Sequence, residues 1–252
     1  MADHQGRRRA RAEAGRLRLL PPDSSIKARA RLAGLLYMLN GIPAWFSLMY
    51  VPSAFIVSGD ATATARNIAN GEFVYRLGIL SELLSQTMFI FVVLVLYDLL
   101  KDVDRRYARL MVTLVAISVA FEFVNCLNLV APLLMLHDAE FLSAFTKPQL
   151  DALGLVFLKL RDSGLNIVSS LWGLWLLPFG LLVYKSGLFP RILGVLPIIA
   201  CFAYLADSFA SIISPAPPHV ISTVSLTVGA IGELSIFAWM IVKGAKMSGQ
   251  SA

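Results

Sequence analysis

The chain has 252 residues, of which 57% are hydrophobic and only 15% are charged, and its formal net charge is +6. Soluble domains contain about 25% charged residues, so this composition excludes an ordinary water-soluble protein and indicates that lipid surrounds most of the chain. The basic excess is concentrated before the first apolar run, where it acts as an orientation signal. We therefore do not expect a nucleic acid as a partner.

The first segment of the chain is basic, and nine of the 22 Lys and Arg residues precede Leu32. We predict a disordered cytoplasmic arm over residues 1–30, a transmembrane domain over 31–244 and a short cytoplasmic tail over 245–252. We expect no cleavable signal peptide, because the apolar region begins near Leu32 and is longer than the roughly 7 to 15 residues of a signal core.

Six apolar runs are long enough to cross a bilayer, which needs about 20 residues. They lie approximately at residues 32–57, 77–100, 110–136, 164–184, 192–213 and 220–242. The sequence therefore predicts an all-α integral membrane protein, a six-helix bundle in contact with the lipid bilayer.

The connections between these spans differ sharply in charge. Seventeen of the 22 basic residues lie in the N-terminal arm, in the two connections on the same side, and in the tail. The positive-inside rule then places both termini in the cytoplasm, and an even number of spans requires the two termini to share a side.

The two long connections on the other side carry helix signals. Asp60 suits the N-cap of a short helix that ends near Gly71, and Pro148 suits the first turn of another helix. A continuous helix from Pro148 to Tyr184 would be about 55 Å long, against a hydrocarbon core of about 30 Å. We therefore expect this helix either to break at Ser163 and Gly164 or to project from the membrane.

A weak internal repeat is visible. The phrase RLAGLL at residues 31–36 is similar to RILGVL at 191–196, and each is followed by a span with the pattern GxxxEL, which places Glu82 and Glu233 at equivalent positions. We interpret this as a duplicated in-out-in helical hairpin, with the middle pair of spans as a diverged third copy. Chance recurrence of short apolar phrases is the alternative.

Four acids lie inside the predicted spans: Glu82, Glu122, Asp207 and Glu233. A charged side chain at the centre of a bilayer costs about 2.5 to 3.5 kcal/mol on insertion scales, so these acids are expected to face the bundle interior. We expect no Lys or Arg at the depth of Glu122 and Glu233. Arg161, near the outer boundary, is expected to reach only the outer acids.

Amides extend this polar set. Glu122, Asn125 and Asn128 share one helix face because they are spaced three residues apart, and Asn166 lies in the fourth span. The functional interpretation is a polar cavity in which acids are protonated or hold a cation. The structural alternative is hydrogen bonding between helices, worth about 0.6 kcal/mol per contact.

Catalytic and metal motifs are scarce. His137, Asp138 and His219 are weak candidates for an external metal site, because they lack a recognised ligand spacing. Cys126 and Cys201 lie in apolar runs and form no disulfide framework. We expect no cofactor.

Four stretches, in this order and spacing, resemble one family: RLAGLLYMLNGIPAWF, LYDLLKDVDRRYARL, SGLFPRILGVLPIIACFAYLADSF and GELSIFAWMIVKG. The family is a group of bacterial membrane proteins termed domain of unknown function 4386. The resemblance covers about Ala30 to Gly244. It implies six helices in the bacterial cytoplasmic membrane and assigns no catalytic or binding residue.

The sequence supports one main hypothesis and two alternatives. The main hypothesis is that the protein binds or moves a small cation, a proton or a polar metabolite through residues that include Glu122 and Glu233. A homodimer is compatible with it, since six spans are few for a transporter of one chain. The alternatives are an intramembrane lipid-directed enzyme that uses His137 and His219, and a non-catalytic partner or sensor subunit.

Overall fold

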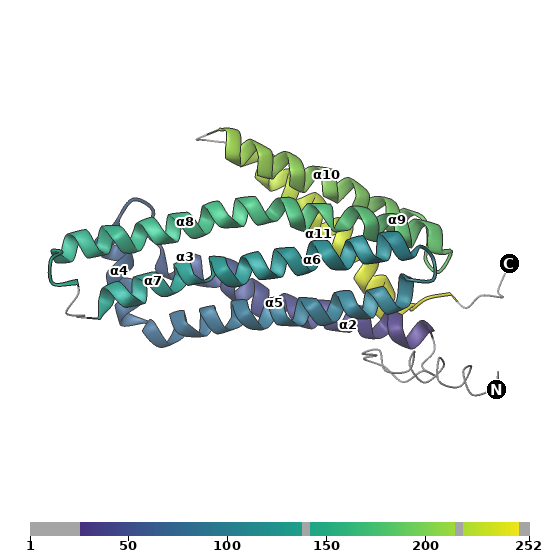
Figure 1. Cartoon of the computed structure of the whole chain (residues 1–252), viewed down its shortest axis with the longest axis horizontal. Helices are drawn as coiled ribbons and strands as arrows, with labels where there is room; N and C mark the ends of the chain where they lie inside the picture. Colours follow the sequence, from purple (N-terminus) through teal and green to yellow (C-terminus); the bar gives the residue numbers. More distant parts are fainter. Residues whose placement is uncertain (1–25, 138–141, 215–218, 247–252) are drawn as a thin grey trace, which may run out of the picture.

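The computed structural model describes residues 26–137, 142–214 and 219–246 (Figure 1). Within these ranges every regular element is a helix, and six stretches are long and apolar enough to span a membrane. The elements are α2 (Ile26–Trp45), η1 (Phe46–Tyr50), α3 (Val51–Phe55), α4 (Ala61–Asn70), α5 (Glu72–Leu100), α6 (Arg105–Asn125), α7 (Leu127–Leu136), α8 (Lys147–Leu174), α9 (Leu176–Ser186), α10 (Ile192–Ile213) and α11 (His219–Val242). The predicted six-helix membrane bundle is thus confirmed.

The six spans are α2 to α3, α5, α6 to α7, α8 to α9, α10 and α11. Each span contacts the next one along the chain, and α11 returns to contact α2, so the spans form a closed ring. In Figure 1 the first helix, α2, and the last residues of α11 lie at the same end of the bundle, which we call the terminal end. The opposite end carries α4 and is called the α4 end.

Large apolar side chains cover the outside of this ring. Examples with more than half of their surface exposed are Ile42, Phe202, Ile212, Ile213 and Leu226. In a soluble protein such exposure would be costly, whereas in a bilayer these side chains contact lipid tails. The bilayer is therefore a partner of this surface.

Two of the spans are broken in the middle of the bundle. One residue interrupts the helix in each case: Cys126, between α6 and α7, and Trp175, between α8 and α9. Both residues keep a right-handed helical backbone. Pro132 and Pro178 follow in α7 and α9, and each lacks the N–H that would bond to the carbonyl four residues earlier.

The expected break at Ser163 and Gly164 is absent, because α8 runs without interruption from Lys147 to Leu174. Together α8 and α9 span 40 residues, about 60 Å of helix. The alternative expectation is therefore correct, and the first half of α8 extends beside α7 and α4 at the α4 end (Figure 1).

The caps of the α4 end agree with the sequence. The Asp60 carboxylate accepts a hydrogen bond from the Ala63 N–H at 2.8 Å and so begins α4. Thr146 and Gln149 form a capping box at the start of α8, with Pro148 in its first turn. These local signals gave correct helix starts because a cap depends only on neighbouring residues.

The predicted domain boundaries fall close to the helix ends. Residues 26–30, which we assigned to the arm, already belong to α2. Ala245 and Lys246, assigned to the tail, pack against the bundle, and the Lys246 N–H donates to the Leu188 carbonyl at 2.9 Å. Residues 1–25 and 247–252 lie outside the described part of the chain.

The proposed hairpin duplication remains a prediction. Gly78 and Gly229, which begin the two GxxxEL phrases, each lie close to the preceding span, at Val51 and Tyr204 respectively. Glu82 and Glu233, the acids within these phrases, have different partners, which are described below. The bundle therefore does not establish a common origin for the two hairpins.

Buried side chains form two apolar clusters separated by a polar layer. The larger cluster, towards the terminal end, includes Ala33, Phe89, Val119, Trp175 and Phe237. The smaller one, towards the α4 end, includes Val51, Tyr75, Cys126, Leu129 and Leu158. Between them along the first four spans lie buried polar residues, which we call the polar layer: Asn40, Glu82, Ser85, Gln86, Glu122, Asn125 and Arg161.

Small residues bring the helices of the terminal half close together. A Cβ atom on Gly194 would lie 2.6 Å from the Tyr184 nitrogen and 2.7 Å from the Gly180 carbonyl oxygen, so α9 and α10 pack backbone to backbone. A Cβ on Gly34 would lie 2.7 Å from the Phe237 carbonyl oxygen, which fixes the contact between α2 and α11. Such contacts are typical of membrane helices, where glycine allows close approach.

We predict that Gly194→Ala destabilises the protein by about 1 to 3 kcal/mol, because the new methyl group meets backbone atoms that cannot move aside. Thermal unfolding of the detergent-purified protein would measure this change. Gly41→Ala is the matched control, since no atom lies within 4 Å of its Cβ position. If Gly194→Ala has the same unfolding temperature as Gly41→Ala, or a higher one, the close packing of α9 on α10 is contradicted.

Candidate functional site

The polar layer contains a buried ion pair between the second and fourth spans. Arg161 Nη2 lies 3.0 Å from Glu82 Oε2, and the two side chains are 3% and 2% exposed. The prediction that Arg161 reaches an outer acid is therefore confirmed for Glu82. The prediction that it reaches only the outer acids is wrong, because the buried Arg161 also interacts with the mid-depth Glu122. Arg76, the other basic residue of the second span, pairs instead with Glu72 one turn away on the same helix, at the α4 end.

Glu122 lies beside this ion pair. Its carboxyl interacts with Glu82, Arg161 and Asn125, and its side chain is buried. Its Oε1 atom has no hydrogen-bond partner among the described residues. Two carboxyl groups and one guanidinium, contributed by three different spans, therefore meet in the interior of the bundle.

Two asparagines complete this cluster, as the shared helix face predicted. Asn125 Nδ2 donates to the Arg161 carbonyl oxygen at 3.2 Å, and Asn128 Nδ2 donates to Asn125 Oδ1 at 3.1 Å. The Asn125 side chain fits because Gly164 faces it on α8, where a Cβ atom would lie 2.3 Å from Asn125 Oδ1. Gly164 therefore has a packing role at the position where the sequence suggested a helix break.

Glu233 lies in a second polar site, at the edge of a cavity. The Tyr37 and Tyr204 hydroxyls both donate to its carboxylate, the latter at 3.1 Å. The cavity has a volume of about 200 Å³. Its lining residues are Tyr37, Asn40, Ala44, Leu48, Ser85, Gln86, Phe89, Trp172, Trp175, Tyr204 and Glu233.

Two residues of the cavity wall carry side-chain oxygens that the protein leaves unpaired. Asn40 Oδ1 and Gln86 Oε1 are buried and have no hydrogen-bond partner within the described chain, and both residues line the cavity. A buried acceptor without a partner costs about 1 to 3 kcal/mol. Because both oxygens are closed off from the open space, the acidic group that the lining offers to a ligand is the Glu233 carboxylate.

The cavity extends along one side of the first span. Its lining residues from that span are Tyr37, Asn40, Ala44 and Leu48, spaced so that they form one stripe that runs towards the α4 end. On the terminal side it ends at the larger apolar cluster, to which Phe89 and Trp175 belong. The cavity is thus closed by packing towards the terminal end.

The ion-pair cluster and the cavity are neighbours along α5. Gln86, which lines the cavity, is four residues after Glu82, and Ser85 is three residues after it. Residues at these spacings are adjacent on the same helix face. One turn of α5 therefore connects the buried ion pair with the open space beside Glu233.

Two predicted ligand-binding residues lie outside both sites. Asn166 is exposed, and its carbonyl oxygen accepts a hydrogen bond from Ser208 at 2.6 Å. Asp207 is half-buried and accepts a hydrogen bond from Ser222 at 2.7 Å. Neither residue lines the cavity or contacts the ion pair, so we do not include them in the candidate site.

The weak metal candidates do not form a site in the described residues. His137 lies 3.3 Å from Glu72 and is exposed. Asp138 and the side chain of His219 lie outside the described part of the structure. Among the residues that are described, no group of three His, Cys, Asp or Glu side chains is placed to hold a metal ion.

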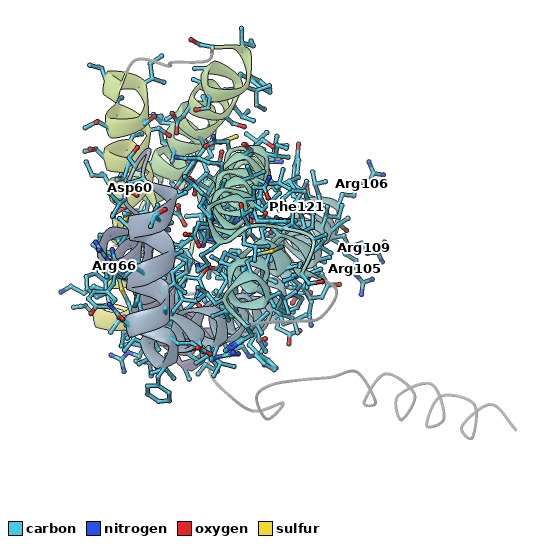
Figure 2. All side chains as sticks on the ribbon, turned by 90° about the vertical axis from the view of Figure 1, so that its left-hand side faces the viewer. Asp60, Arg66, Arg105, Arg106, Arg109 and Phe121 are labelled. Carbon is cyan, nitrogen blue, oxygen red and sulfur yellow. The ribbon has the colours of Figure 1, made fainter. Side chains whose placement is uncertain are left out.

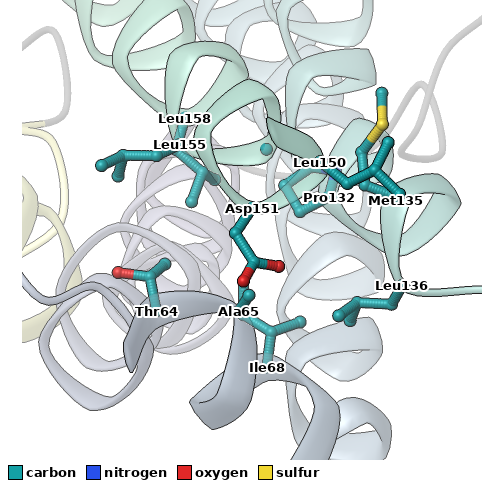
Figure 3. Close-up of a pocket in the computed structure, with 11 residues that line it drawn as sticks. Thr64, Ala65, Ile68, Pro132, Met135, Leu136, Leu150, Asp151, Leu155 and Leu158 are labelled. Atoms are coloured by element: carbon teal, nitrogen blue, oxygen red, sulfur yellow. The ribbon is translucent and has the colours of Figure 1, made fainter. Parts of the chain in front are cut away.

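Sequence reasoning missed a buried acid at the α4 end. Asp151 points from α8 towards α4 and pairs with Lys147 on its own helix (Figure 3). The pocket around it, between α4, α7 and α8, has a volume of only about 10 Å³, roughly the space of one water molecule. We interpret it as a packed joint between the helices, since a ligand has no room there.

Comparison with known proteins gives a family but no functional relative. The family model described as domain of unknown function (DUF4386) matches residues 32–244, which is most of the chain. No curated protein matches the chain, and no solved structure matches it.

We predict that Arg161→Met destabilises the protein by about 3 to 5 kcal/mol, because it leaves Glu82 without its cation in a buried place. Adding Glu82→Leu to this variant is expected to restore much of the loss, since the double variant leaves no unpaired charge from the pair. Thermal unfolding of the two single variants and the double variant would measure this coupling.

Arg76→Met is the control for this cycle, because its ion pair with Glu72 is exposed and exposed pairs contribute little. Equal, small effects of Arg161→Met and Arg76→Met would show that the interior pair is not stabilising.

Proposed function

We propose that this chain, which belongs to the DUF4386 family, binds a small organic cation within the membrane, in the cavity beside Glu233. One observation carries the proposal: the cavity combines a carboxylate with aromatic walls.

The carboxylate of the cavity favours a cationic ligand. An ionised Glu233 carries a negative charge and can only accept hydrogen bonds. No cation of the protein is paired with Glu233 among the described residues; its partners are two tyrosine hydroxyls. A positively charged ligand would supply the missing charge.

The walls of the cavity favour an organic cation over a metal ion. Five of the lining side chains are aromatic: Tyr37, Phe89, Trp172, Trp175 and Tyr204. Aromatic faces attract organic ammonium groups, and this attraction strengthens where water is excluded. The volume of about 200 Å³ is adequate, since an engineered cavity of about 150 Å³ is known to hold benzene. An ammonium compound of that size is the best match.

The distribution of charge supports the orientation. Arg105, Arg106 and Arg109, at the start of α6, are exposed and project away from the bundle (Figure 2). They belong to the terminal end, which carries most basic residues, so we assign that end to the cytoplasm of a bacterial inner membrane. The stripe from Tyr37 to Leu48 then runs from mid-membrane towards the outer side, which makes the outer half of the membrane the side of entry.

The lining residues come from the first, second, fourth, fifth and sixth spans. A homodimer is compatible with binding at this place. A cavity closed on its cytoplasmic side suits either the outward-facing state of a transporter or a receptor site, and the experiment below separates the two.

We predict that choline and tetramethylammonium raise the unfolding temperature of the detergent-purified protein, whereas the neutral carbon isostere of choline does not. A ligand at 100 times its Kd stabilises by about 2.7 kcal/mol. Glu233→Gln is expected to abolish the shift, and Trp172→Ala is expected to weaken it, because the first removes the charge and the second an aromatic wall.

Asp162→Asn is the matched control, since Asp162 is a partly exposed acid of α8 that does not line the cavity. A shift of the same size with the neutral isostere, or in Glu233→Gln, would refute a cation site. If binding is found, uptake of labelled choline into proteoliposomes identifies a transporter, and binding without uptake identifies a receptor.

A further inference from the structure

The cluster of Glu82, Glu122 and Arg161 has one more acid than it has cations. Arg161 Nη2 donates to Glu82 Oε2 at 3.0 Å, so the guanidinium is matched by one carboxylate. Glu122 interacts with both members of the pair, and all three side chains are buried. If both acids were ionised, the bundle would hold an uncompensated negative charge in a medium where that is very costly.

Within the described part of the chain, the other groups that face the cluster do not supply the missing positive charge. From α5, Tyr75 directs its hydroxyl to the Leu129 carbonyl oxygen at 3.0 Å. At the break between α6 and α7, the Cys126 thiol lies close to both acids. The remaining neighbours are the neutral amides of Asn125 and Asn128. From α8, Arg161 is the cation that interacts with Glu122.

We infer that Glu82 and Glu122 form a proton-binding site, in which Glu122 carries the proton. The proton is bonded to a carboxyl oxygen of Glu122 and is donated to the Glu82 carboxylate, which also accepts from Arg161. With one proton the cluster is neutral. Loss of that proton leaves an ionised Glu122 whose Oε1 has no donor among the described residues.

The site is distinct from the cavity beside Glu233 but adjoins it. Ser85 and Gln86 line the cavity and lie one helical turn from Glu82. Because the cavity provides polar atoms and space within the bundle, it gives the proton a route to water without unfolding. The inference does not require that the cavity bind an organic cation, since it rests on the charge balance of the cluster.

The test combines infrared spectroscopy with thermal unfolding, using protein in lipid at neutral pH. We expect the carbonyl band of a protonated carboxylic acid in the wild type, and its loss in Glu122→Gln. We also expect the stability of the wild type to fall as the pH rises through the range in which Glu122 loses its proton. Deprotonation leaves an uncompensated negative charge buried in the folded cluster, so the folded state loses stability.

Glu122→Gln is expected to remove this pH dependence while keeping the unfolding temperature at neutral pH, because glutamine resembles the protonated acid. Glu72→Gln, which changes a partly exposed acid at the α4 end, is the control and is expected to alter neither readout. An unchanged infrared band together with an unchanged pH dependence in Glu122→Gln would overturn the inference.

If Glu122→Gln does not accumulate, the band is sought in Glu233→Gln, which keeps both cluster acids. A protonated-carboxyl band that disappears at high pH, while the helical amide bands persist, supports the site. Absence of that band overturns the inference.

Discussion

The ion pair between Arg161 and Glu82 is the constraint around which the interior is arranged. It joins α8 to α5 between two apolar clusters, and both of its side chains are buried. Such a pair persists only if its neighbours complete its hydrogen bonds. The second acid, the asparagines of the broken third span, and the glycine that makes room for them can all be understood as consequences of placing this guanidinium inside the membrane.

The same constraint explains why the bundle is hollow beside the polar layer. The terminal half packs through glycines and large apolar side chains, and the pocket of about 240 Å³ between α5 and α6 is apolar. At the level of Gln86 and Asn40, polar side chains replace the apolar ones, and Trp172 and Tyr204 form part of the cavity wall. A membrane protein gains little from filling such a gap with apolar groups, because lipid already surrounds the outside. The open space is thus compatible with a stable bundle, and it lies beside a carboxylate.

The sequence was most informative where the signal was local or depended on the bilayer. Span positions, the Asp60 cap and the interior location of Glu82, Glu122 and Glu233 follow from apolar run length, neighbouring residues and the cost of charge in lipid. The depth of Arg161 could not be predicted, because the uninterrupted path of α8 past Gly164 depends on the fit of Asn125 from another span. The roles of Tyr37 and Tyr204 were also missed, since an aromatic residue in an apolar run gives no sign of its hydrogen-bond partner. The exposure of Asn166 depends likewise on which face of α8 meets α10.

The closure of the ring has a consequence for the order of the chain itself. The first and last spans are direct neighbours, and Gly244, with a φ of 69°, lies against Lys27. A linker between Lys246 and Ile26 would therefore connect two points at the same end of the bundle. A circularly permuted chain that starts at Arg105 would keep every helix neighbour and every helix direction. The fold is therefore defined by which spans are neighbours. The chain could begin and end at a different connection between spans without changing these neighbours.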